Sequence, residues 1–173
     1  MYKRQSQIAA EDYIDIRFRM PSGEDYIVVS KKKVEIPQID GVDSATTIWL
    51  QLTEDEILTM SNAIVENYMI EGSVLYTAKY VEPGTQEKAT PTYVPSEAVQ
   101  NLLRNNDSNI LNTAKLALLT RYQGNSDVRN NINNTKNSID PDDVATNIST
   151  GVKQEVSTAQ EQRQDYLDAL SGN

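Results

Sequence analysis

Carboxylates are the residues of this chain whose types and spacing could do chemistry, because the sequence contains no His and no Cys. They gather in two runs, residues 54–56 (Glu-Asp-Glu) and residues 140–143 (Asp-Pro-Asp-Asp). A calcium loop needs acids at alternate positions followed by a glycine, and neither run has that spacing. Both runs stand at the start of an expected helix, where the helix dipole stabilises negative charge. We therefore expect no metal site and no cofactor.

The absence of His and Cys also excludes several classes of catalysis. Serine and cysteine triads of the usual composition, zinc sites with nitrogen and sulfur ligands, and His acid/base catalysis all need these residues. No Gly-rich loop follows an expected strand, so nucleotide binding lacks its usual sign. A glycosidase-type carboxylate pair stays open, because such pairs are assembled in space rather than in sequence. We expect a protein that is not an enzyme and assign no catalytic residue.

The net charge of the chain limits the classes of partner that it is expected to bind. A net charge of −9 argues against electrostatically driven binding to nucleic acid or to an anionic membrane. No apolar run approaches the ~20 residues of a membrane span, and the start of the chain lacks a signal-peptide core. We expect a soluble chain that is not exported by that route, whose nine Tyr supply rings suited to protein interfaces.

The elements that position these side chains are organised around one expected helix. It covers residues 53–70, and a capping box of Thr53 and Glu56 starts it. One apolar stripe runs along the helix at three- and four-residue intervals. The stripe consists of Ile57, Met60, Ile64, Val65 and Tyr68. Apolar and polar residues alternate over residues 46–52 and 73–81, which predicts a strand on each side of the helix.

Two further strands are expected before this helix. Residues 14–20 alternate apolar and polar side chains, and a turn leads to residues 26–30, which should pair back as a hairpin. Lys31, Lys32 and Lys33 follow. We interpret the three lysines as a solvated strand end that protects a sheet edge from stray pairing, and a contact with phosphate or an acidic partner is the alternative.

A proline-rich loop is expected after the strand of residues 73–81. Residues 82–96 contain three prolines, too many for the interior of a helix or strand. Tyr93 and Val94 are apolar in this otherwise polar stretch. They could dock on a neighbouring subunit or fold back onto their own core, and we include both among the candidate interface residues.

The next part of the chain predicts two helices and a linker. Residues 96–103 and 110–122 carry helical apolar patterns, separated by a polar break. Residues 125–137 are rich in Asn, with only Val128 and Ile132 apolar. This composition is typical of a loose segment.

The last residues, 138–173, predict a long helical arm. Asp140 can cap a helix with Pro141 at its first position, and the pattern extends to Leu170. Its apolar residues recur at helical spacing: Val144, Ile148, Val152, Val156, Tyr166 and Leu170. A narrow stripe on a long polar helix buries little by itself, so we expect it to contact another helix or another chain. We assign these residues to a homo-oligomer interface.

Together the elements predict an α+β fold. It has a small antiparallel β-rich body with a central amphipathic helix, followed by a helical C-terminal half with a long terminal helix. We divide the chain into a body of residues 1–95 with its hub helix 53–70, a helical segment of residues 96–137 that includes the Asn-rich linker, and an assembly arm of residues 138–173.

In residues 53–80, the Asn-rich stretch and the polar helix from Asp140, the chain resembles structural proteins of tailed-bacteriophage virions. It is most similar to small head-to-tail ring proteins, called connectors or adaptors, such as those of crAss-like phages. The resemblance implies a virion protein assembled in the host cytoplasm, a ring of many copies docked on the portal, helical tails gripping neighbours and an acidic lumen for DNA. Less helix is expected before Ser96 than in purely helical adaptors, so capsid decoration or a tail-ring role stays open.

Three functions follow from these observations. The first is a non-enzymatic structural subunit of a large symmetric assembly, which joins its neighbours through the C-terminal helix and has portal or tail components as further partners. The second is an intracellular adaptor that binds one protein as a monomer, through Tyr93 and the proline-rich loop. The third is a carboxylate hydrolase, which requires two acids that converge in a pocket.

Overall fold

The computed structural model describes residues 8–39, 41–44, 47–105 and 112–171, and these form the predicted α+β fold. The elements along the described chain are β1 (Tyr13–Arg19), β2 (Asp25–Glu35), β3 (Gln38–Ile39), β4 (Val42–Asp43), β5 (Trp49–Leu50), α1 (Glu54–Met69), β6 (Val74–Lys79), α2 (Glu97–Arg104), α3 (Asn112–Gly124), α4 (Ser126–Asn137) and α5 (Pro141–Ser171).

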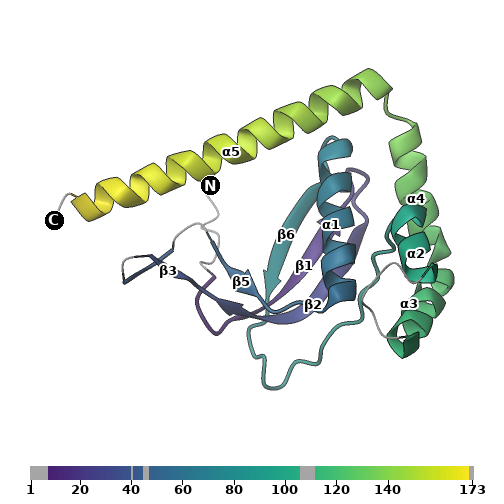
Figure 1. Ribbon diagram of the computed structural model, residues 1–173, viewed down its shortest axis with the longest axis horizontal. Helices are drawn as coiled ribbons and strands as arrows, with labels where there is room; N and C mark the ends of the chain where they lie inside the picture. The colour runs from purple at the N-terminus through teal and green to yellow at the C-terminus, as the bar shows by residue number, and fades with distance from the viewer. Residues whose placement is uncertain (1–7, 40, 45–46, 106–111, 172–173) are drawn as a thin grey trace.

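Strand β1 lies inside a four-stranded antiparallel sheet of order β5-β2-β1-β6 (Figure 1). Ile14, Ile16 and Phe18 alternate along β1 and are all buried, as their spacing predicts. β2 is longer than expected and includes the three lysines. The strand expected over residues 46–52 is reduced to the two residues of β5, and Thr46 lies outside the described residues.

Helix α1 lies across one face of the sheet (Figure 1). Its capping box is formed, and the Thr53 N–H donates to the Glu56 carboxylate at 2.9 Å. The buried side of the helix is not the expected apolar stripe, because it carries Thr59, Ala63 and Glu66. Thr59 and Ala63 are small enough to let the helix approach its neighbours closely, and the charge of Glu66 is met by partners described below.

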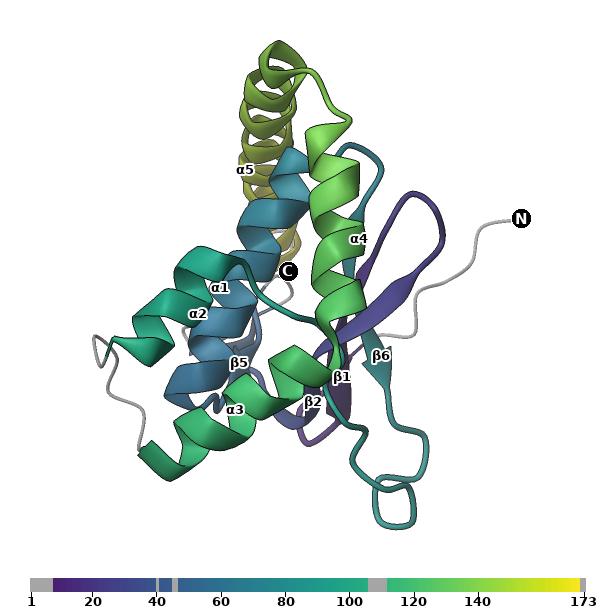
Figure 2. The same ribbon diagram turned by 90° about the vertical axis from the view of Figure 1, so that its right-hand side faces the viewer.

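The hydrophobic core consists of two clusters. The larger joins the sheet, α1 and α4, and its buried members are Ile16, Phe18, Met20, Val28, Val29, Ala63, Ile70, Tyr93 and Ile132. The second contains Val94, Leu103, Leu118 and Tyr122, where α2 and α3 lie beside α1 (Figure 2). Since Tyr93 and Ile132 share a cluster, residues 1–95 and 96–137 share one core.

The Asn-rich stretch is not a loose linker, and this corrects the expectation. Residues 126–137 form helix α4, in which Ile132 is fully buried in the larger cluster and Arg129 is almost fully buried. Asn is a weak helix former, but tertiary packing of one helix face outweighs intrinsic propensity. The stretch is therefore part of the folded body.

Tyr93 and Val94 fold back onto their own core, so their assignment to an interface with a neighbouring subunit is wrong. Each side chain is 1% exposed, and the ring of Phe18 meets the ring of Tyr93 edge-on with centroids 5.8 Å apart. Backbone hydrogen bonds explain why these two side chains point into the core. The N–H groups of Thr92 and Tyr93 donate to the Ile27 carbonyl at 2.9 and 3.0 Å, which ties this end of the loop to β2.

Helix α5 begins where the sequence predicts. The Asp142 N–H donates to the Asp140 side chain at 2.9 Å, and Pro141 is the first helical residue. Figure 1 shows α5 passing the end of α1 and continuing away from the other helices. From Val152 to Gln164 every side chain is exposed. No helix in the described part of the chain combines the length and the hydropathy that a membrane crossing needs.

Candidate functional site

The most concentrated set of charged groups lies inside the protein, around Glu66 of α1. Its carboxylate is 2.8 Å from the Arg129 guanidinium and 3.5 Å from the Lys136 ammonium, both on α4. The hydroxyl of Tyr93, from the loop before α2, donates to it at 2.7 Å. We call these four residues the Glu66 centre. It joins three segments that are far apart in the sequence.

The Glu66 centre is built for stability rather than for chemistry on a substrate. Glu66 is 0% exposed, so its carboxylate faces no solvent. Arg129 also donates to the Val94 carbonyl at 3.2 Å and to the Asn133 side chain at 3.0 Å. A buried charge costs free energy unless it is paired and hydrogen-bonded. The Glu66 carboxylate meets both conditions, because it is paired with two bases and accepts from Tyr93, whereas Arg129 Nη2 is paired with Glu66 without a well-aligned hydrogen bond.

Sequence reasoning missed the Glu66 centre. Its partners Tyr93 and Lys136 lie 27 and 70 positions from Glu66, with Arg129 between them in the sequence, and no local pattern predicts contacts over such separations. The sequence contained one local signal of this centre, in the spacing of its two bases. Arg129 and Lys136 are seven positions apart with Ile132 between them, so all three lie on one side of a helix.

The Glu66 centre predicts a loss of stability in alkali. Burial, and then the charge of Glu66, raise the pKa of Tyr93 above its ordinary value of 10.0. The folded protein thus keeps a proton that the unfolded chain releases above pH ~10, so this stabilisation is complete below pH ~10 and is lost as the pH rises. We expect the free energy of unfolding to fall by about 1.4 kcal/mol in total between pH 9 and pH 11 from this group, with a slope that approaches about 1.4 kcal/mol per pH unit above that range.

The measurement is urea unfolding between pH 9 and pH 11, and the matched variant is Tyr93→Phe. Tyr68 and Tyr76 also have raised pKa values, beside Glu155 and Asp25, so the variant should retain part of the slope. An identical slope in the two proteins would contradict a role for Tyr93.

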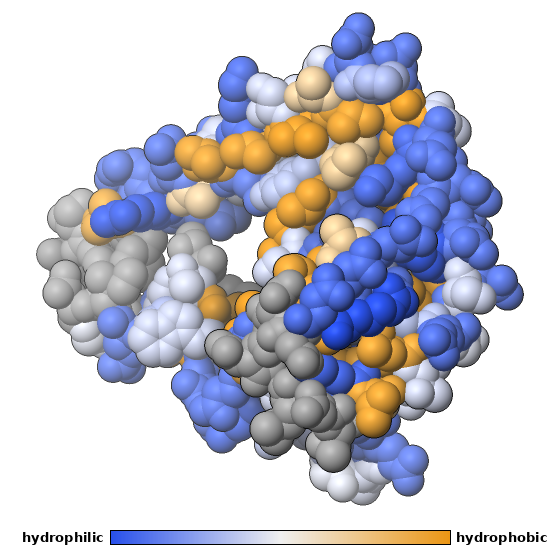
Figure 3. All heavy atoms as spheres, turned by 45° about the vertical axis from the view of Figure 1, so that its right-hand side comes forward, coloured by the Kyte–Doolittle hydropathy of each residue, from blue (hydrophilic) through white to orange (hydrophobic). Residues whose placement is uncertain are grey.

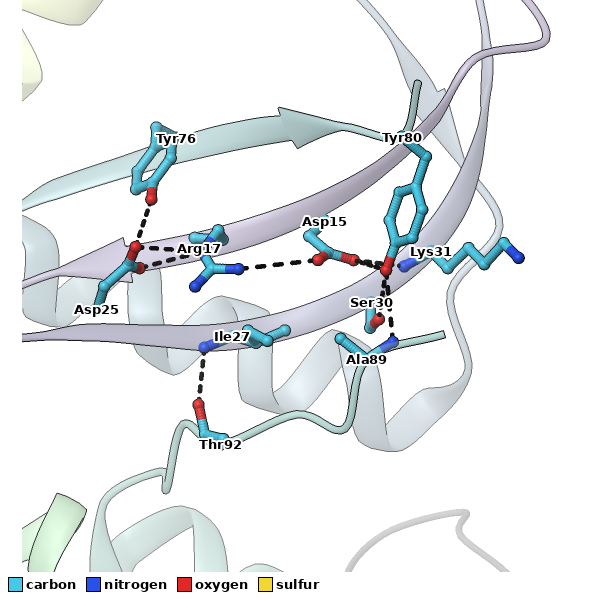
Figure 4. A network of polar contacts seen from close by, with 10 residues as sticks. All are labelled: Asp15, Arg17, Asp25, Ile27, Ser30, Lys31, Tyr76, Tyr80, Ala89 and Thr92. Carbon is cyan, nitrogen blue, oxygen red and sulfur yellow. Dashed lines mark hydrogen bonds and ion pairs between the residues drawn. The ribbon is translucent and has the colours of Figure 1, made fainter. Parts of the chain in front are cut away.

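A second polar network covers the face of the sheet opposite α1 (Figure 4). Asp15, 5% exposed, accepts a hydrogen bond from the Tyr80 hydroxyl at 2.9 Å. Asp25 accepts from Arg17 at 3.2 Å and from the Tyr76 hydroxyl. Each acid therefore has its partners within the sheet. The network fixes the three strands β1, β2 and β6 relative to one another.

The three lysines of β2 each contact a different partner in the chain. Lys31 has a positive φ of 48° at an irregular point of β2, and the Asp15 carboxylate accepts its N–H at 2.8 Å. The ammonium groups contact the Gln86 carbonyl (Lys31, 2.6 Å), Glu56 (Lys32, 2.6 Å) and Glu11 (Lys33, 2.5 Å). These contacts disfavour the phosphate-binding interpretation.

The two carboxylate runs serve as helix starts. Within residues 54–56, Asp55 accepts from the Thr53 hydroxyl at 2.6 Å, and Glu56 accepts from the Thr53 N–H. In the second run, Asp140 caps α5. Among the described residues, no group of three or more His, Cys, Asp or Glu side chains is placed to hold a metal ion.

A groove of about 670 Å³ lies where α5 passes the end of α1. Its lining includes Asn67, Tyr68, Glu71, Gly151 and Glu155. A Cβ on Gly151 would lie only 3.0 Å from the ring of Tyr68, which explains a glycine inside a helix at this crossing. The Tyr68 hydroxyl donates to Glu155, one of the two acids in the lining. These contacts set the position of α5 on α1.

The predicted interface residues of α5 follow a gradient of exposure. Val144 and Ile148 are half-buried, whereas Val152 is 42% and Val156 51% exposed. The side chains of Tyr166 and Leu170 lie outside the described residues. Leu167, which the sequence analysis did not include, is 45% exposed. Figure 3 shows the resulting line of apolar atoms along α5.

The fold and these sites define an α+β protein with a closed ionic centre and an open apolar line on a projecting helix. The chain was compared with protein-family models, curated proteins and solved structures, and none of them matches it.

Proposed function

We propose that this chain is a non-enzymatic structural subunit that joins copies of itself through α5 into a symmetric assembly. The observation that carries the proposal is the exposure of Val152 and Val156 on a helix of 31 residues that leaves its own body. Burial of the exposed half of such side chains by a second molecule is favourable, at about 0.7 kcal/mol or more for each valine. A projecting helix with an apolar line supports an arm that contacts a neighbour.

We further propose a place for this subunit in a phage virion, as a head-to-tail ring component on the portal. The support is the resemblance stated above. A body of strands and helices and a prolonged terminal helix are among the features on which that resemblance rests. Copies of the chain and portal or tail components are the partners under this proposal.

The monomeric adaptor is the weaker candidate. It requires Tyr93 to reach a partner, and Tyr93 is buried with its hydroxyl bonded to Glu66. A hydrolase requires two free acids in a pocket, and Glu155 in the groove is engaged by Tyr68.

The test is a chain that ends at Gly151. This truncation keeps Val144, Ile148 and the close approach of Gly151 to Tyr68. It removes the exposed part of α5 together with the Tyr68–Glu155 hydrogen bond. We expect the truncated chain to fold, with the circular dichroism of the body retained, and to have the mass of one chain by light scattering. A truncated chain that kept the full mass of the assembly would show that α5 does not join the subunits.

A further inference from the structure

Strand β6 leaves one edge of the sheet open. It is the last strand in the order β5-β2-β1-β6, and β1 is its only strand neighbour in the described part of the chain. Just after β6, the Tyr80 N–H donates to the Tyr13 carbonyl on β1 at 2.8 Å. The backbone groups of a strand point alternately to its two sides, so those of Leu75, Thr77 and Lys79 point away from β1. Among the described residues, none bonds to these outward N–H and C=O groups.

The opposite edge of the sheet is covered. β5 pairs with Val34 and Glu35 of β2. Further along β2, the Ile27 N–H donates to the Thr92 hydroxyl at 2.9 Å, and the Ile27 carbonyl accepts from the Thr92 N–H. Between these two contacts β2 is irregular at Lys31, where φ is 48°. Irregular points, lysines and covering loops are the usual means by which proteins keep a sheet edge from pairing with another chain.

Strand β6 lacks such protection over most of its length. It contains no proline, its six residues pair with β1 in an unbroken register, and none of the six is buried. Its one charged residue is Lys79 at the last position, and the Asp12 carboxylate of the same chain lies 2.7 Å from that ammonium. An open and regular edge of this kind is a template for a further strand.

The sequence of β6 fits a second β6 that runs antiparallel to it. One register sets the three outward residues of the two copies against one another, with Thr77 opposite Thr77 and Leu75 opposite Lys79. The single charge of each strand then lies opposite a leucine, whereas an aligned parallel pair would set Lys79 beside Lys79, which is destabilising. The nearest acids along the chain, Glu71 and Glu82, lie outside the strand in the turns at its two ends.

The side chains on the face opposite α1 are also compatible in this register. Val74 lies beside Tyr80 of the other copy, and Tyr76 lies beside Ala78. An aromatic ring beside a β-branched side chain is a favourable cross-strand pair. Val74 is 37% exposed in the single chain, so the pairing covers part of an exposed apolar side chain.

The open edge and the projecting helix lie on the same side of the body. Figure 1 shows β6 on the side away from α2, α3 and α4, and α5 extends past β6 on that side. A copy that pairs through β6 therefore lies on the side to which the α5 of its neighbour extends. This arrangement favours a second copy of this chain, rather than a strand of another protein, as the occupant of the edge.

We propose that β6 pairs antiparallel with β6 of a second copy, centred on Thr77, so that two four-stranded sheets become one sheet of eight strands. The inference rests on the proposed function and names a second contact in the same assembly. This contact has a two-fold axis at Thr77, and about six backbone hydrogen bonds form across it. An interface of so few residues is weak by itself, so we expect it to gain strength where α5 also holds the copies together.

Single cysteines test the contact directly, because the sequence contains no Cys. In full-length Thr77→Cys the two thiols face each other, with Cα atoms about 5.5 Å apart, which suits a disulfide. The matched control is Lys79→Cys, whose two thiols are roughly 13 Å apart along the strands and beyond disulfide reach. We expect Thr77→Cys to form linked pairs about tenfold or more faster than the control under mild oxidation. Electrophoresis without reductant measures both rates.

The outcomes separate this inference from the proposed function. Equal rates in the two variants, with the assembly intact, would overturn the inference and leave the proposed function standing. Fast linkage of Thr77→Cys in a chain whose unmodified form is monomeric would overturn the proposed function and leave the β6 pair standing. Faster linkage of Lys79→Cys would indicate a parallel pair and overturn the antiparallel register.

Proline at the same position provides a second test without a thiol. Because the Thr77 N–H points away from β1, Thr77→Pro keeps the hydrogen bonds to β1 and removes a donor from the centre of the pair. We expect Thr77→Pro to lower the affinity between copies about tenfold, whereas Thr77→Ala, the matched control, should change it little. Circular dichroism checks that both variants are folded. Equal affinity in the two folded variants would contradict the β6 pair.

Discussion

Replacing Glu66 with alanine is expected to lower the free energy of unfolding by about 3–5 kcal/mol, the usual cost of removing one partner from a buried ion pair. The variant leaves Arg129 without its carboxylate in a site where the arginine side chain is 6% exposed. It also removes the acceptor of the Tyr93 hydroxyl. Because typical domains are stable by only 5–15 kcal/mol, this loss is a large part of the total.

The measurement is urea unfolding followed by circular dichroism, with Glu71→Ala as the matched control. Glu71 follows α1 closely in the chain and is exposed, so its loss should change stability by less than about 0.5 kcal/mol. A combined Glu66→Leu/Arg129→Met/Lys136→Met variant should recover much of the loss, since apolar residues of similar volume often replace a buried charged cluster well. A decrease below about 1 kcal/mol in Glu66→Ala would contradict the structural role of the centre.

The second large effect is expected on assembly. In Val152→Asp/Val156→Asp, each contact between copies should weaken by about 3 kcal/mol or more, which is about a hundredfold in affinity. The reason is that two valines that are buried by a neighbour become carboxylates that cannot be buried without a partner. Both residues are exposed in the single chain, so folding should be unaffected.

The matched control is Ser157→Asp/Gln164→Asp, which adds the same two carboxylates to exposed positions on another side of α5. Sedimentation over a range of concentrations measures the affinity in both variants. Equal weakening by the two variants would show that added negative charge, not the apolar line, causes the effect.

The sequence predicted the elements whose signals are local. The alternation of Ile14, Ile16 and Phe18, the capping box before α1 and the Asp140–Pro141 start of α5 are confirmed. These signals arise within a few residues, so neighbouring segments do not alter them.

The sequence did not predict what depends on distant partners. Helix α4 forms because Ile132 and Arg129 have places in the core and at Glu66, although its Asn-rich composition suggests a loose chain. The buried side of α1 is small and polar for the same reason, and Tyr93 turns inward because Ile27 holds its backbone. In each case tertiary contacts outweigh local propensity.

The mass of the unmodified chain in solution tests the self-assembly proposal most directly. Light scattering coupled to size exclusion gives this mass without any variant, over a range of concentrations. We expect one defined species of several chains, held by the apolar line of α5. The mass of a single chain at every concentration would contradict the proposal that this protein is the subunit of a symmetric assembly.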